Sequence, residues 1–258
     1  MTAESHGMPG ESRKADYPPV TMPGYLYLLA LLPPAAAAVA LVASYDALPD
    51  PMPTHWGFTG EPDSWSPKSM GTLLFGVLLG PVICVLAMGF VGLFVRVHSG
   101  SLFERGGAKS TLDAQRTWHE LKVMQPLMGW YCVMLSTSMT VMMLGLNGPW
   151  GWLQGISGWI DALGMLGILA STVWLLVVMG RRGDAVAERF PHPDGRRRRW
   201  LMFMDIPGSD RVMVDTGSGM NFTFNVATRG GRIGAVVMLL LLAGTAVMLL
   251  SMAVTALF

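Results

Sequence analysis

Charged residues are scarce in this chain. Asp, Glu, Lys and Arg make up only 14% of its 258 residues, whereas 52% are hydrophobic. Soluble globular chains carry about one quarter charged residues, so this composition excludes an ordinary soluble domain and places the chain in the membrane class. The only two cysteines, Cys84 and Cys132, both lie inside apolar runs. We interpret them as small buried side chains and not as a disulfide or a metal pair.

The motifs of the common enzyme classes are also missing. The sequence has no HExxH zinc motif, no phosphate-binding loop, no dinucleotide fingerprint and no Ser/His/Asp set. Gly217-Ser218-Gly219 lacks the strand and helix of a nucleophile elbow and is interpreted as a turn. No segment resembles a groove-reading helix or a base-stacking platform. We therefore expect no enzyme, no direct nucleic-acid binding, no cofactor and no bound metal.

Five apolar runs are each long enough to cross a bilayer, since about 20 helical residues span a hydrocarbon core of about 30 Å. The sequence therefore predicts an all-α integral membrane protein with five transmembrane helices. An alternative for the first run is a cleaved signal peptide, but the long, weakly basic leader and the length of the run favour a helix. The runs are 24–44, 71–95, 124–146 and 156–180, which form a four-helix region over 24–180, and 233–258.

Lys and Arg gather on one side of these runs. All but one of the 18 basic residues fall in the tail 1–23, the loop 96–123 or the loop 181–232, and the exception is Lys68. Cytoplasmic loops carry an excess of Lys and Arg. We therefore expect the N-terminus inside the cell and the C-terminus outside, with 46–70 as an outward loop.

The first two cytoplasmic segments differ in character. Residues 1–23 are small, polar and mixed in charge, which predicts a disordered tail. In the loop 96–123, Ser110-x-x-Asp113 is a helix-start signal. We expect this helix to lie along the headgroups and to turn inward near Pro126.

The loop 181–232 is long enough to hold a module of its own. Short runs rich in β-branched and aromatic residues alternate there with glycine-containing turns, which predicts a small cytoplasmic β-rich insertion at about 200–228, before the last helix. A basic run precedes it beside the inner leaflet, where each basic residue is attracted by about 1 kcal/mol. We expect contact with anionic headgroups or with a protein partner at Arg196, Arg197, Arg198, Arg199 and Trp200.

The outward loop holds the densest set of unusual residues. Its five prolines remove backbone donors and restrict their neighbours, which predicts an extended, turning loop. Two tryptophans offer apolar contact area and several polar side chains offer anchors, which favours recognition of a ligand or peptide. The alternative is a structural cap at headgroup level. The candidate ligand-binding residues are Asp50, His55, Trp56, Gly60, Asp63, Trp65 and Lys68.

One acid, Asp161, lies inside an apolar run, about one turn from its outer end. Intramembrane carboxylates are unfavourable and commonly mark a proton or cation site. Two interpretations stay open: such a site, or a shallow carboxylate that simply reaches water, which we favour.

Pairs of small residues spaced four apart predict close contacts between helices, either within one bundle, which we favour, or between copies of the chain in a homo-oligomer. These pairs are Gly76 and Gly80, Ser136 and Thr140, and Gly167 and Ser171.

The outward loop also carries a recognisable pattern: Leu48-Pro49, Met52-Pro53-x-His55-Trp56, Gly60, Asp63, Trp65 and Lys68, directly after the first apolar run. The pattern resembles the signature segment of the SdpI-type family of bacterial membrane proteins, although Gly57 stands where the family often has Asn or Asp. The resemblance implies a multi-pass protein of the bacterial cell membrane. Well understood members protect the cell against a secreted toxic peptide and hold a transcriptional repressor at the membrane. An extracellular peptide ligand and a cytoplasmic protein partner are therefore implied.

A second pattern resembles a small uncharacterised module found near the C-terminus of members of the same family. This resemblance implies a fold and no function. Its residues are Trp200, Phe203, Pro207, Asp210-Arg211, Val214, Gly217-x-Gly219 and Asn225-x-Ala227.

Three functions stay open. The first, which we favour, is SdpI-like sensing of an extracellular peptide or envelope signal, or protection against it, with a relay to a cytoplasmic partner. The second is a transporter or permease component that uses Asp161. The third is a membrane enzyme whose metal is held by His55 and the acids of the outward loop, although their spacing matches no metal motif.

Overall fold

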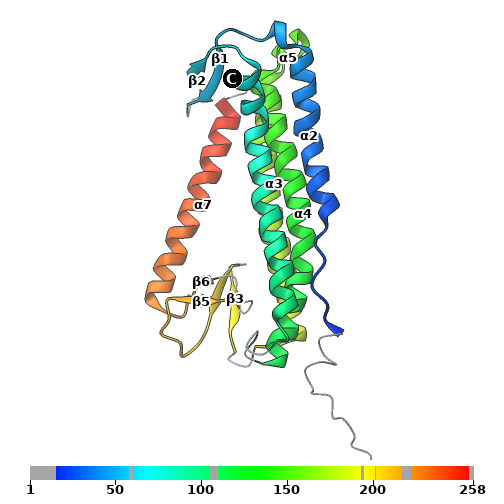
Figure 1. Cartoon of the computed structure of the whole chain (residues 1–258). Coiled ribbons are helices and arrows are strands. Elements are labelled where there is room, and N and C mark those ends of the chain that lie inside the picture. Colours follow the sequence, from blue (N-terminus) through cyan, green and yellow to red (C-terminus); the bar gives the residue numbers. More distant parts are fainter. Residues whose placement is uncertain are drawn as a thin grey trace, which may run out of the picture. The chain divides into compact units, whose positions relative to one another are not determined.

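The computed structural model describes residues 16–57, 61–104, 108, 110–192, 195–200, 202–216 and 222–255. Within these residues, five helices are long and apolar enough to span a bilayer (Figure 1), which indicates a multi-pass integral membrane protein. Each of the five predicted runs overlaps one of them. The helices are α2 (Gly24–Ala43), α3 (Met70–Ser101), α4 (Thr111–Asn147), α6 (Ser157–Arg189) and α7 (Arg229–Thr255).

Helix α4 starts well before its apolar run. Its 37 residues extend for about 55 Å at 1.5 Å per residue, which exceeds a hydrocarbon core of about 30 Å. The Ser110 hydroxyl accepts a hydrogen bond from the backbone N–H of Asp113 at 3.1 Å, so the predicted helix start is confirmed. Helix α4 continues through Pro126 without a break, so the predicted helix and the apolar run that follows it form one element. Prolines are tolerated in membrane helices where neighbouring groups satisfy the freed carbonyls.

The chain divides into two compact units. Helices α3, α4, α6 and α7 contribute residues to both units, because each helix crosses a boundary in the sequence. Unit 1 comprises 1–22, 90–127 and 176–238, and unit 2 comprises 23–89, 128–175 and 239–258.

Unit 2 is held together by close helix contacts at small residues, although Gly76 of the predicted pairs has no atom within 4 Å of an added Cβ. A Cβ added at Gly164 in α6 would lie 2.5 Å from the backbone nitrogen of Met142 in α4. Ser136 in α4 donates a hydrogen bond of 2.6 Å to the carbonyl of Ala30 in α2. A buried apolar cluster joins α2 to α3 and to the chain between them; it contains Ala37, Ala38, Leu41, Leu48, Met52, Leu73 and Val77.

The segment between α2 and α3 forms a β-hairpin in unit 2. A 3₁₀ turn, η1 (Tyr45–Ala47), precedes β1 (Met52–Trp56), which pairs antiparallel with β2 (Pro62–Ser66). The register places Met52 opposite Ser66 and Trp56 opposite Pro62. The sequence predicts an extended loop here and misses its pairing into strands.

Unit 1 contains two short antiparallel strand pairs within the predicted loop 181–232. The first is β3 (Arg197–Arg199) with β4 (Phe203–Asp205), and the second is β5 (Met213–Asp215) with β6 (Phe222–Phe224). A bridge between Met204 and Asn225 links the two pairs. The basic run, expected to precede the sheet, therefore forms its first strand.

Asn225 is fully buried between the two strand pairs. Its Oδ1 accepts hydrogen bonds from the backbone N–H groups of Ile206 at 3.1 Å and Ala227 at 3.2 Å. Its Nδ2 donates to the carbonyl of Ser209 at 3.2 Å. One buried side chain thus makes three hydrogen bonds to the backbone, two of them to the turn 206–209, which explains an Asn at this position.

The last residues of the predicted tail pack in unit 1. The indole N–H of Trp118 in α4 donates to the carbonyl of Pro18 at 2.7 Å, and the backbone N–H of Val20 donates to Ser99 in α3 at 2.8 Å. The sequence assigns Pro18 and Val20 to a disordered tail, whereas these bonds hold them on α3 and α4. Residues 1–15 lie outside the described part of the chain.

Candidate ligand-binding cleft

A cavity of about 750 Å³ lies in unit 2. Residues from the hairpin, α3, α4, α6 and α7 line it, and most of them are apolar. Methionine is frequent in this lining, and its unbranched, polarizable side chain adapts to ligands of different shape. The lining methionines are Met52, Met142, Met143, Met165 and Met252.

Asp161 is the acid of this cavity. Its side chain comes from α6, is only 5% exposed, and has an Oδ1 without a hydrogen-bond partner among the described residues. Close packing of α4 on α6 sets its position, since a Cβ added at Gly145 would lie 2.7 Å from the Asp161 nitrogen. With 5% of its surface exposed, Asp161 meets little solvent, which favours the interpretation as a site.

The hairpin contributes His55 and Trp56 to the same cavity. Trp56 is half-buried, whereas the His55 side chain is 69% exposed. The Nδ1 of His55 lies 2.5 Å from the Oδ1 of Asp63, so the two strands are joined by this pair. The structure therefore brings His55, Trp56 and Asp161 to one cavity, although the sequence treats the outward loop and the intramembrane acid as separate sites.

Two other candidate residues stabilise the base of the hairpin. The backbone N–H of Lys68 donates to Oδ1 of Asp50 at 3.1 Å. The Lys68 ammonium group donates to the carbonyl of Leu48 at 2.9 Å and to that of Asp46 at 3.2 Å, and lies 4.9 Å from the centre of the Tyr45 ring. These contacts favour the structural-cap interpretation for Asp50 and Lys68.

The last two candidates lie elsewhere. Trp65 on β2 is 51% exposed and is not part of the cavity lining. Gly60 lies outside the described residues. Within the part of the chain that the structure describes, no group of three or more His, Cys, Asp or Glu side chains could hold a metal ion.

Three of the four arginines of the predicted basic surface contact other residues of unit 1. Arg196 donates to the carbonyl of Asp215 at 2.9 Å, and Arg198 pairs with Asp184 of α6 at 3.1 Å. Arg199 pairs with Asp205 at 3.3 Å. Arg197 and Trp200 are exposed, so these two are the ones best placed to meet a partner or a headgroup.

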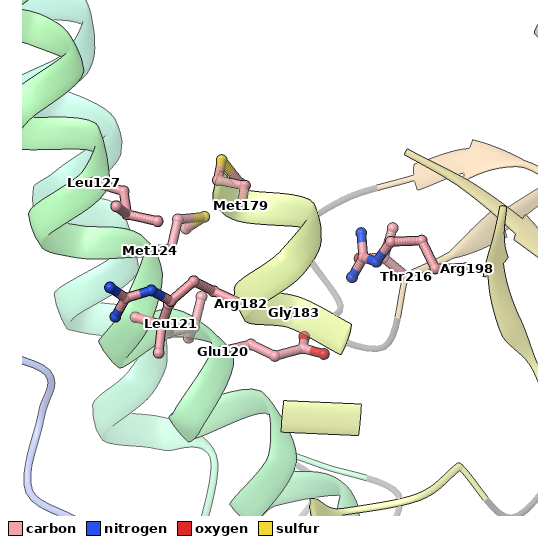
Figure 2. Close-up of a pocket in the computed structure, with 10 residues that line it drawn as sticks. Glu120, Leu121, Met124, Leu127, Met179, Arg182, Gly183, Arg198 and Thr216 are labelled. Carbon is pink, nitrogen blue, oxygen red and sulfur yellow. The ribbon is translucent and has the colours of Figure 1, made fainter. Parts of the chain in front are cut away.

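A smaller cavity of about 100 Å³ lies beside this surface in unit 1. Figure 2 shows its lining side chains: Glu120, Leu121, Met124 and Leu127 come from α4, Met179, Arg182 and Gly183 come from α6, Arg198 comes from β3, and Thr216 directly follows β5. A Cβ added at Gly183 would lie 2.7 Å from a guanidinium nitrogen of Arg198, at the flexible end of that side chain. The cavity is too small for more than a few atoms.

Several residues that line the large cavity could not be predicted from the sequence. Thr72 and Asn147 are polar groups near the ends of α3 and α4, and the methionines are spread over the chain. None stands in a motif, because only the folding of distant segments brings them together.

Comparison with known proteins gives one match. The model of a family described as a domain of unknown function (DUF1648) matches residues 35–80, a stretch that includes His55 and Trp56 and is compatible with a membrane protein family. No curated protein matches the chain. No solved structure matches it either.

Proposed function

We propose that this chain is a membrane receptor of the SdpI-like type, which binds an extracellular peptide in the cleft next to the hairpin and reports it to a cytoplasmic partner. One observation carries the proposal: the hairpin residues His55 and Trp56 line the same cavity as the buried Asp161. A volume of about 750 Å³ falls in the range of ligand sites, roughly 300–1,000 Å³. It suits a few side chains of a peptide and not a folded protein.

The proposed orientation is N-terminus inside and C-terminus outside, in a bacterial cell membrane. The distribution of basic residues supports it, because Lys68 is the only Lys or Arg outside the tail 1–23 and the loops 96–123 and 181–232. In this orientation the hairpin and its cleft meet ligands from outside the cell.

The proposed relay uses the strand pairs of unit 1. Trp200 sits in the turn between β3 and β4 with a φ of 50° and is 56% exposed. Exposed Trp and Arg side chains are enriched among residues that dominate binding energy at protein interfaces. Trp200 and Arg197 would thus contact a cytoplasmic protein such as a transcriptional repressor.

A deletion strain tests this function. We expect it to be more sensitive to a panel of secreted peptide toxins, and we expect wild-type protein, but not the Trp56→Ala variant, to restore resistance. Trp152→Ala is the matched control, because Trp152 is 71% exposed in α5 (Gly151–Gln154) and does not line the cavity. Unchanged sensitivity of the deletion strain, with no protein captured by a photo-crosslinker at Arg197, would contradict the proposal.

A transporter is the second candidate, and the buried Asp161 favours it specifically, because intramembrane acids mark ion and substrate paths. A transporter should take up its substrate into proteoliposomes in the presence of an ion gradient, and this uptake should disappear in Asp161→Asn. We propose no catalytic activity. Zinc bound tightly to the purified protein, and lost in both His55→Ala and Asp63→Ala, would contradict that part of the proposal.

A further inference from the structure

The cleft carries a buried acid, Asp161, that no described side chain neutralises. Asp161 is 5% exposed, and its Oδ1 has no hydrogen-bond partner in the described part of the chain. No Lys or Arg is among the described lining residues. A buried carboxylate without a partner is strongly unfavourable in low-dielectric surroundings, so a cation from outside the chain would stabilise it.

His55, the one basic side chain among the described lining residues, already has a partner. His55 lies 2.5 Å from Asp63 across the hairpin, and both groups are more than half exposed to solvent. His55 thus has a carboxylate partner of its own at the rim. The charge of Asp161 is left for a ligand.

The composition of the cavity argues for an organic cation. Hard metal ions such as Ca²⁺ need six to eight oxygen ligands. Among the described lining residues most are apolar, and Asp161 is the only one with a carboxylate. An ammonium or guanidinium group attached to apolar atoms satisfies both features at once. Its charge meets the carboxylate, and its apolar part packs against Leu73, Val77 and the methionines.

We infer that the cleft recognises peptides that carry a basic group, from Lys, Arg or a free amino terminus, next to apolar side chains, and that this group pairs with the Asp161 carboxylate. The inference rests on the proposed function and names the class of peptide accepted there. Recognition then has two parts: apolar burial supplies affinity, and the acid rejects uncharged or anionic peptides, which would leave it unpaired.

Binding of two synthetic peptides tests the inference. The probes are acetyl-Leu-Leu-Lys-Leu-Leu-amide with a tritiated acetyl group and the same peptide with Gln in place of Lys, added to full-length protein in phosphatidylcholine nanodiscs. We expect wild-type protein to bind the Lys peptide at least tenfold more tightly than the Gln peptide. Asp161→Asn should abolish this ratio while still binding the Gln peptide, which also shows that the variant is folded. Glu188→Gln removes an exposed carboxylate from the same helix and should keep the ratio.

The possible outcomes separate this inference from the proposed function. If both peptides bind equally, or if the tenfold ratio persists in Asp161→Asn, the cation assignment is wrong and the peptide receptor stands. If neither peptide binds, both are overturned. If phosphatidylethanolamine in the nanodiscs removes the advantage of the Lys peptide, a lipid amine occupies the site, which contradicts the peptide assignment.

Discussion

Gly164 shows how strongly a single residue determines the contact between α4 and α6. An added Cβ would meet the backbone nitrogen of Met142 at 2.5 Å and its Cα at 2.7 Å. Backbone atoms cannot move aside as a flexible side chain can, so the helices would have to separate. The same contact region contains Asp161, whose nitrogen faces Gly145.

We therefore predict that Gly164→Ala destabilises the protein by about 2 kcal/mol, within the range for overpacking a core. Gly76→Ala is the matched control, because Gly76 is also helical and has no atom within 4 Å of the added Cβ. Unfolding of both variants in detergent micelles should show a lower midpoint for Gly164→Ala alone. Equal midpoints would contradict the close α4–α6 contact.

Arg116 is a buried cation on α4 with a structural role in unit 1. It is 1% exposed, forms an ion pair with Asp113, and donates to the carbonyls of Phe190 at 3.4 Å and Pro191 at 3.3 Å. These carbonyls follow the last turn of α6, where acceptors lack partners within the helix. Arg116 therefore ties the end of α6 to α4.

Replacing the Arg116 side chain should strongly lower the stability of the protein, because Asp113 would lose its partner and the two carbonyls would lose their donor. We predict that Arg116→Met lowers the free energy of unfolding by about 3 kcal/mol. Arg199→Met should lower it by less than about 1 kcal/mol, since the Arg199 side chain is 55% exposed in its pair with Asp205. Denaturant unfolding of the purified variants compares the two, and similar losses would refute a special role for Arg116.

At the scale of elements, the hairpin is the part that makes the cleft possible. Its base depends on Lys68, which joins the start of the segment to its end through the carbonyls of Asp46 and Leu48. Because the ammonium group donates to carbonyls, a side chain without donors cannot replace it.

Lys68→Met should therefore loosen the hairpin without unfolding the helices. We predict about tenfold faster hydrogen exchange of hairpin amides, which corresponds to about 1.4 kcal/mol. Amides of α4 and α6 should exchange as in the wild-type protein. Lys122→Met, which removes a Lys that lies 4.7 Å from the Trp118 ring in unit 1, is the control and should leave the hairpin unchanged. Unaltered hairpin exchange in Lys68→Met would show that this lysine does not hold the base.

The elements differ in how far the sequence predicts them. Long apolar runs leave few alternatives to a spanning helix, so the five helices could be predicted. The hairpin could not, because prolines at strand positions argue against pairing. The structure pairs Pro53 with Trp65 and Pro62 with Trp56. A two-stranded hairpin tolerates this, since each strand has one edge where no N–H is needed.

The cleft itself was beyond sequence reasoning. His55, Trp56 and Asp161 could each be picked out as candidates by residue type, yet nothing in the sequence indicates that residues about a hundred positions apart share a cavity. Their meeting depends on the hairpin and on the close α4–α6 contact at Gly145 and Gly164. Asn225 could be picked out only through the resemblance to the small C-terminal module. Its role is to join two strand pairs, and the sequence does not indicate which strands lie next to each other.

In the molecule as a whole, the proposed function assigns ligand binding and partner binding to two different regions. Reception belongs to the hairpin and its cleft in unit 2, and relay belongs to the strand pairs in unit 1. The separation requires these two regions to lie on opposite sides of the membrane, as the distribution of Lys and Arg predicts. All other parts of the proposed function depend on this sidedness.

Labelling of single cysteines tests most directly whether the hairpin and the strand pairs lie on opposite sides of the membrane. In a Cys84→Ala, Cys132→Ala background, Glu61→Cys probes the hairpin and Asp210→Cys probes the strand pairs, and both positions are exposed. A membrane-impermeant maleimide should label Glu61→Cys in intact cells and Asp210→Cys only after the cells are permeabilised. Labelling of both positions from the same side would contradict the division between an outward receptor cleft and a cytoplasmic relay.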